Sequence, residues 1–325
     1  MNSVHNERGS VIVFVTLMIV LLLIMVGIGL DTGQLTATRS QGQAAVDAAA
    51  LAAVSGLPVQ PNPENEVNQR VAAFNASNDY VKKSSNPIGG PNITYVQYNE
   101  TTDAITTLPG ITSANGVRVA LESNSGTAIT TPVFLTPLMN LFGQSAPSTV
   151  DVNVSAVAAL KVLPSVPIAI MQNLCGGSSS IRDASASTDN SCWTTYTDSS
   201  SPNQVRTLFD GSASCSGLPA NTDQITKGTS ITLDDNSDPS TYQKAADLFC
   251  PGGTCTGCWI VPVIANGSNC SSNASIVDWA RICPSKVQSS KIDVTTVIKC
   301  NQNLFRAADN LCFSPRLVRD TKSGM

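Results

Sequence analysis

The chain has 325 residues, ten cysteines and a net charge of −4, and only 13% of its residues are charged. A nucleic-acid-binding protein carries a basic stripe, so this composition and the absence of any Lys/Arg run exclude nucleic acid as a partner. Abundant Ser, Thr, Asn and Gly favour an exported, loop-rich protein.

Residues 11–30 form an apolar run with one Thr and no charge. A helix of 20 residues is about 30 Å long, which matches the hydrocarbon core of a bilayer. The alternative is a cleaved signal peptide, which has a shorter apolar region and a small-x-small cleavage site. No Ala-x-Ala occurs at the end of this run, in residues 29–34. We therefore predict a retained transmembrane helix at 11–30, preceded by a cytoplasmic tail at 1–10.

The cysteines predict the orientation, because the flanking charges Arg8 and Arg39 are close to a tie under the positive-inside rule. An even, dense set of cysteines indicates an oxidising compartment. We expect a cytoplasmic N-terminus at a bacterial inner membrane and a bulk that is periplasmic or surface-exposed. The expected disulfide cysteines, whose pairing stays open, are Cys175, Cys192, Cys215, Cys250, Cys255, Cys258, Cys270, Cys283, Cys300 and Cys312.

An Ala-rich extension at 31–57 continues the apolar helix. Ala is the best helix former, and Gly56 and Pro58 are terminators, so we predict one helix over about 10–56. Gln41, Ala45, Ala48 and Ala52 share one face, which could pack against another helix or a second copy of this chain. Gly29 and Gly33 form a small-xxx-small pattern at the outer membrane edge. Asp31, at the same edge, marks the water boundary or contacts a partner.

Residues 58–163 are predicted to form a small α+β domain. A helix starts at Asn62-Pro63-Glu64, where a cap residue precedes Pro and an acidic residue. Strand-rich segments follow at 92–99 and 116–122, with a short apolar helix at 132–143 and a strand over 150–162.

Residues 164–325 are predicted to form a second, Cys-rich α+β domain. Pro164 and Pro167 bracket the boundary, and every cysteine follows it. The predicted elements are buried strands at 166–171, 259–264, 276–282 and 292–298 and a helix at 238–249, with polar loops between them. The fold class is thus α+β, behind a long N-terminal transmembrane helix.

The order of motifs in the first 55 residues resembles that of the TadE/TadG-like family. The motifs are Arg8-Gly9, the apolar run, Asp31-Thr32-Gly33, Arg39, and an Ala-rich block over 43–53 that begins Gln-Ala-Ala-x-Asp. The resemblance implies a role in assembling the Flp (tight adherence) pilus, with other pilus-assembly proteins as partners. The suspected packing or partner contacts are Gly29, Asp31, Gly33, Arg39, Gln43, Ala45, Asp47, Ala48 and Ala52. Processed prepilin-like relatives carry Glu at the fifth position after the cleaved Gly; Phe14 stands there, which favours the TadG-like kind.

Three motifs carry candidate chemistry. Residues 183–187 read Asp-x-Ser-x-Ser, as in the metal site of a von Willebrand factor A domain, but no hydrophobic strand precedes them. Residues 234–238 resemble the start of a calcium loop, but Pro239 and Ala245 stand where Gly and Glu are needed, so a turn and a helix cap at Asp238 are favoured. Cys255 and Cys258 form a CxxC that is expected to be structural.

No catalytic residue, metal or cofactor is predicted. The single histidine, His5, lies in the predicted cytoplasmic tail, so histidine-based catalysis is not available to the exported part. The first hypothesis is a non-catalytic, membrane-anchored scaffold of pilus assembly. The alternatives are a surface adhesin that binds a ligand or calcium through 164–325, a processed pseudopilin, and an exported oxidoreductase using Cys255 and Cys258.

Overall fold

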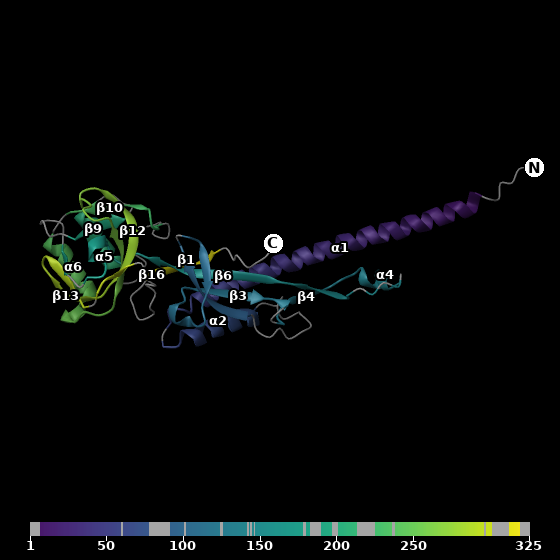
Figure 1. Ribbon diagram of the computed structural model, residues 1–325, viewed down its shortest axis with the longest axis horizontal. Coiled ribbons are helices and arrows are strands. Elements are labelled where there is room, and N and C mark those ends of the chain that lie inside the picture. The colour runs from purple at the N-terminus through teal and green to yellow at the C-terminus, as the bar shows by residue number, and fades with distance from the viewer. Residues whose placement is uncertain are drawn as a thin grey trace, which may run out of the picture.

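The computed structural model shows an elongated molecule with the N-terminal helix at one end and a domain rich in disulfides at the other (Figure 1). A smaller sheet lies between them. The structure describes residues 7–59, 61–77, 92–100, 102–123, 126–141, 143, 145, 147–177, 180–182, 190–196, 201–212, 225–235, 238–295, 297–300 and 312–318. The α+β class behind a long apolar helix is confirmed.

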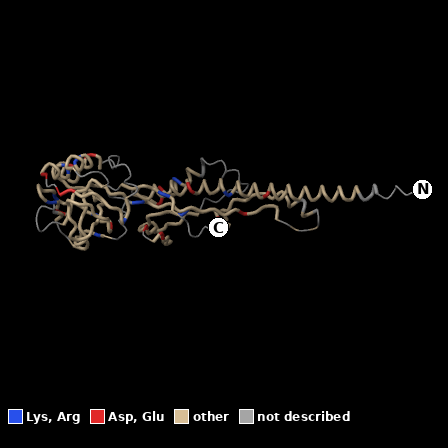
Figure 2. The backbone as a smooth tube through the Cα atoms, turned by 90° about the horizontal axis from the view of Figure 1, so that it is seen from above, with Lys and Arg blue, Asp and Glu red and all other residues tan. Residues whose placement is uncertain are grey.

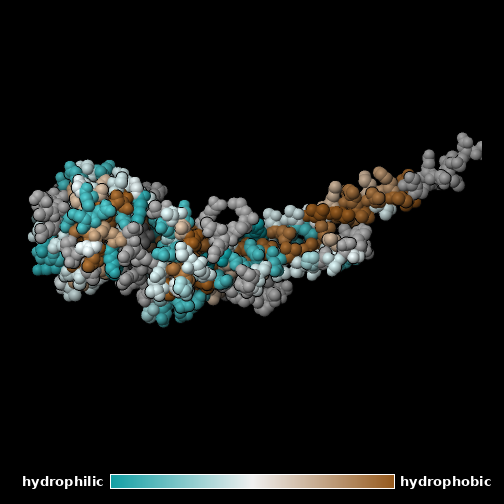
Figure 3. Space-filling view, viewed as in Figure 1, coloured by the Kyte–Doolittle hydropathy of each residue, from teal (hydrophilic) through white to brown (hydrophobic). Residues whose placement is uncertain are grey.

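Helix α1, Glu7–Val54, is continuous, as the lack of internal Pro predicts. At 1.5 Å per residue its length is about 72 Å. Its first half is suited by length and hydropathy to a single membrane span, and its side chains there are exposed (Figure 3). Figure 2 shows almost no charge along this half. The helix ends where Gly56 turns the chain, and a Cβ at Gly56 would lie 3.0 Å from the backbone N of Val67. This close approach brings the next helix back against α1.

The membrane-proximal unit is an antiparallel sheet covered on one face by α1 and α2, and its strand order is β16-β6-β3-β1-β2. Val46, Ala49 and Val67 from the helices pack against Val117 and Val119 of the sheet. Small side chains on α1 therefore let helix and sheet approach closely. The bounds are α2 Pro63–Ser77, β1 Asn92–Asn99, β2 Ala104–Thr107, β3 Gly116–Leu121, β6 Val154–Leu163 and β16 Cys312–Val318.

A narrow arm, residues 129–152, extends from this sheet along α1 towards the N-terminal end (Figure 1). Its two strands, β4 Ile129–Pro132 and β5 Thr149–Val152, pair antiparallel, and the short helix α4 Thr136–Leu141 forms its tip. The Thr136 hydroxyl donates to the Pro147 carbonyl at 2.6 Å and so closes the tip. Helix α4 lies inside the predicted helical segment at 132–143.

Strand β16 returns the chain to the membrane-proximal sheet, where it pairs with β6 along seven residues. These residues fall within the range predicted for the second domain, yet they complete the first sheet. The two units are thus joined by the short connection after β6 and also by the segment that precedes β16. The exact domain limits remain a prediction.

The distal domain is built on a six-stranded sheet, β10-β9-β7-β11-β12-β15, which closes on itself because β10 also pairs with β12. Strands β7 and β11 are parallel, and the other pairs are antiparallel. The bounds are β7 Ile168–Met171, β9 Ser191–Tyr196, β10 Ser230–Asp234, β11 Trp259–Ile264, β12 Asn273–Ile282 and β15 Lys299–Cys300. A small sheet joins β8 Ser180–Arg182, β13 Pro284–Gln288 and β14 Lys291–Val294.

Alternate residues along the distal strands enter two separate cores. Ile168 and Ile170 pack in one cluster with helices α5 Pro202–Ser212 and α6 Pro239–Phe249, whereas Ala169 and Met171 pack in the other. This follows from the two-residue period of a strand. The side chains of a strand buried on both faces are apolar throughout, as in the sequence of β7 and β11.

Several elements differ from the sequence-based expectation. The strand predicted over 150–162 is divided into β5, which ends at Val152, and β6, which begins at Val154 and belongs to another sheet. A single strand was predicted over 292–298, but β14 ends at Val294 and β15 begins only at Lys299. The Ser/Thr-rich region predicted as loops contains the strands β9 and β10. A hydroxyl of β9 forms a hydrogen bond within the sheet: Thr194 Oγ1 donates to the Thr232 carbonyl of β10 at 2.8 Å. Because these strands contain Ser and Thr, the pattern of hydrophobic residues does not identify them.

Candidate functional site

The predicted contact residues lie on α1 where it leaves the apolar run, and Asp31 is the best defined of them. Its two carboxylate oxygens accept hydrogen bonds from the backbone N–H groups of Phe134 at 2.6 Å and Leu135 at 3.1 Å. Only 8% of Asp31 is exposed. The carboxylate therefore binds the two backbone N–H groups that directly precede α4 and holds the tip of the arm against α1.

Two glycines on α1 make room for the arm, and sequence reasoning did not select either. A Cβ at Gly27 would lie 2.5 Å from Cδ2 of Leu135 at the tip, and a Cβ at Gly42 would lie 2.5 Å from Cδ1 of Ile129 at the base. Gly27, Asp31 and Gly42 thus form one face of α1, which continues through the buried residues Thr38, Ala45 and Ala49. Their spacing of three, four and seven residues in the sequence was the signal that could have identified this face.

Gln43 and Asp47 connect α1 to the sheet. The Gln43 amide nitrogen donates to Asp47 Oδ1 at 2.7 Å and to the carbonyl of Ser155 on β6 at 2.9 Å. These residues of the Ala-rich block therefore have a structural role within this chain.

The remaining predicted residues of α1 lie outside this buried face. Gly29, Gly33 and Arg39 are exposed, and a Cβ at Gly29 or Gly33 would meet nothing within 4 Å. Ala48 and Ala52 are half-buried. The structure thus separates the predicted set: Asp31, Gln43, Ala45 and Asp47 face this chain's own domain or pair within it, while Gly29, Gly33 and Arg39 face outwards.

The cysteines of the distal domain form structural cross-links. The four pairs are Cys175–Cys300, Cys192–Cys270, Cys250–Cys255 and Cys258–Cys283, and Cys312 is also disulfide-bonded. The two cysteines of the CxxC have different partners, so they do not form a CxxC redox disulfide. Cys215 lies outside the described residues.

The other candidate sites give no metal geometry. Within the described ranges, no group of three or more His, Cys, Asp and Glu side chains could hold a metal ion. Asp238 caps α6, as predicted: its carboxylate accepts the Ser240 N–H at 2.9 Å, and this bond lowers the pKa of Asp238. His5 and residues 183–187 lie outside the described residues.

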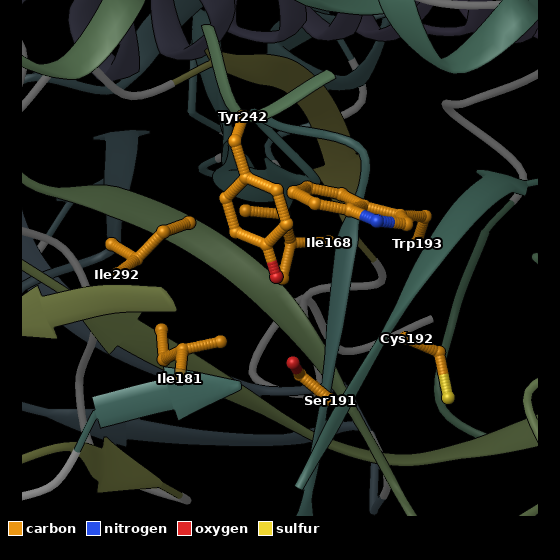
Figure 4. A pocket seen from close by; sticks show the side chains of 7 residues that line it. All are labelled: Ile168, Ile181, Ser191, Cys192, Trp193, Tyr242 and Ile292. Atoms are coloured by element: carbon orange, nitrogen blue, oxygen red, sulfur yellow. The ribbon is translucent and has the colours of Figure 1, made fainter. Parts of the chain in front are cut away.

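One cavity of about 200 Å³, its open mouth included, lies beside α6 in the distal domain (Figure 4). Its lining includes Ile168, Ile181 and Ile292, and the ring of Tyr242 points into it next to Trp193, with ring centroids 5.1 Å apart. Ligand pockets measure roughly 300–1,000 Å³ and combine apolar walls with several polar groups. This small, mainly apolar space lacks the set of polar groups that such a pocket provides, and it identifies no ligand site.

These features define a protein with one apolar helix suited to a single membrane span and a disulfide-rich α+β remainder. Residues 9–56 match the family described as "Putative Flp pilus-assembly TadE/G-like". The match coincides with α1 and its terminating turn, so the N-terminal region is similar to that of TadE/G-like pilus-assembly proteins, in agreement with the resemblance of its motifs. No curated protein and no solved structure matches the chain.

Proposed function

We propose that this protein is a non-catalytic, inner-membrane-anchored scaffold of Flp pilus assembly, with its N-terminus in the cytoplasm and its disulfide-rich domain in the periplasm or at the surface. The observation that carries the proposal is the match of the pilus-assembly family to α1. That helix is at once the apolar span and part of the exterior core, since Val46, Ala49 and Ala53 are buried against the sheet. A force or position set at the membrane is thus transmitted to the exterior through one unbroken helix.

The proposed orientation is supported by the disulfides, because they persist in an oxidising compartment and all four described pairs follow the span. Other pilus-assembly proteins are the proposed partners. The outward face of α1 would receive them, since Gly33, Thr36 and Ser40 are exposed, small and uncharged. The same face would also serve self-association.

A photo-crosslinking residue at Thr36, in the full chain and in its native membrane, tests this proposal. We expect cross-links to other pilus-assembly subunits or to a second copy, with the same residue at Val277 in the distal domain as the control. Deletion of the gene should abolish Flp pili, and the full-length gene should restore them.

Each alternative has its own outcome. Normal numbers of pili with lost attachment to surfaces would replace the scaffold with an adhesin. An intact mass lacking the first nine residues would indicate a processed pseudopilin. Cross-links at Val277 but none at Thr36 would move the partner surface to the distal domain.

A further inference from the structure

The tip of the arm presents apolar side chains at the height of the membrane. Phe134 is 59% exposed and Met139 is 43% exposed, and both lie in or next to α4. No charged residue occurs between Glu122 and Asp151, a stretch that includes almost the whole arm. Transfer of such side chains from water to an apolar environment is favourable.

The contacts of the tip set its depth relative to the span. Leu135 packs on Gly27, which lies three residues before Leu30, the last residue of the apolar run. Three residues of helix correspond to about 4.5 Å, so this contact lies within the apolar layer rather than above it. Asp31, at the outer edge, is bonded to the backbone of Phe134 and Leu135 and keeps the tip at this level.

We propose that the tip of the arm, residues 133–141, is immersed in the outer interface of the same bilayer that α1 spans. The chain then contacts the membrane at two places: the spanning helix and the tip of the arm, which enters the bilayer from one side and does not cross it. The lipid acyl chains are the occupant that the structure favours, because the tip is continuous with the span and no Lys or Arg is present to bind a headgroup. Phe is among the apolar side chains that interfacial segments bury in this layer.

The arrangement also explains why the arm is fastened to α1 by a carboxylate. A carboxylate at the edge of the hydrocarbon is costly unless its oxygens are hydrogen-bonded. Two backbone N–H groups supplied by the tip provide these bonds, and in turn Asp31 satisfies N–H groups that would otherwise be without partners in an apolar layer. Span and tip are thus mutually stabilising in the membrane.

Quenching by brominated lipids tests the proposal on the full chain in phosphatidylcholine nanodiscs. The three native tryptophans are buried in the distal domain and provide a constant background. Phe134→Trp adds a fourth tryptophan at the tip, and Val277→Trp adds one at an exposed position on β12 as the matched control. We expect bromine on the acyl chains to remove most of the fluorescence added by Phe134→Trp and none of that added by Val277→Trp.

Equal fluorescence with brominated and ordinary lipid would overturn the proposal, because the tip would then lie in water. A blue-shifted but unquenched signal would also overturn it, since protein rather than lipid would cover the tip. Met139→Trp repeats the measurement at a second tip position if Phe134→Trp disturbs the fold. The result is independent of the pilus role, because it depends only on the span at 11–30.

Discussion

The bond between Asp31 and the arm leads to a prediction that can be worked out quantitatively. Asp31→Ala removes two charge-assisted hydrogen bonds, at 2.6 Å and 3.1 Å, from the backbone of residues 134 and 135. Each such bond is worth at least about 1.5 kcal/mol, so the local opening of the arm should become easier by about 3 kcal/mol. A change of this size increases the population of the open state by ~100-fold.

Hydrogen exchange by mass spectrometry on the full chain in nanodiscs measures this opening directly. We expect amides of residues 129–152 to exchange ~100-fold faster in Asp31→Ala, with the distal domain unchanged, because only the arm depends on this carboxylate. Asp31→Asn keeps one acceptor oxygen and should show a smaller effect. Asp247→Ala, which removes an exposed carboxylate from α6, is the control.

Unchanged exchange in the arm of Asp31→Ala would refute the reasoning, since the arm would then be held by its own strand pairing. Faster exchange throughout the chain would refute it as well, because Asp31 would then stabilise the whole fold rather than one contact.

Three further predictions concern the two units that follow the apolar run. Gly116→Ala should lower the free energy of unfolding in urea by about 1–3 kcal/mol, because the new Cβ would lie 2.9 Å from the backbone oxygen of Ala158. Gly110→Ala is the control: its Cβ would meet nothing within 4 Å, so stability should change by less than about 0.5 kcal/mol. Loss of the Cys175–Cys300 disulfide, which spans 125 residues, should lower the free energy of unfolding by about 5 kcal/mol, because a long closed loop restricts the unfolded chain most. Loss of Cys250–Cys255, which spans five residues, should lower it by only about 2 kcal/mol. Equal losses would contradict this chain-entropy argument. Burial, and then the hydrogen bond to Asp103, raise the pKa of Tyr98 to about 12, so its contribution to stability is complete below pH 10 and is lost as the pH rises towards 12. Tyr98→Phe should flatten the decline in melting temperature over this interval, and an unchanged slope would assign the decline to other groups.

The elements with a strong local signal were predictable. The absence of Pro and the richness in Ala predict the continuous helix that the structure shows as Glu7–Val54. Asp238 followed by Pro239 predicts the start of α6, because a cap and a first-turn proline act within one turn of chain. Buried strands such as β7 and β11 were likewise predictable, since both of their faces are apolar.

The features that join distant segments were not predictable in this way. Residues 134 and 135, which bind Asp31, lie 103 and 104 positions away, and nothing local marks them as partners. The glycines with the visible pattern, Gly29 and Gly33, face outwards, while Gly27 and Gly42 admit the arm. A helix offers several small-residue faces, and only the position of the sheet selects one.

The sequence alone determines the span, the unbroken helix and the compartment signal of the cysteines, because length, propensity and composition act locally or as sums over the chain. The tertiary structure decides which face of α1 packs inwards, that the cysteines of the CxxC have separate partners, and that β16 returns to the first sheet. These outcomes depend on long-range pairing, in which many chain segments compete for the same edge or surface. The free energy of the whole folded core decides which pairing forms. A local sequence pattern cannot predict that free energy, because it depends on contacts between distant segments.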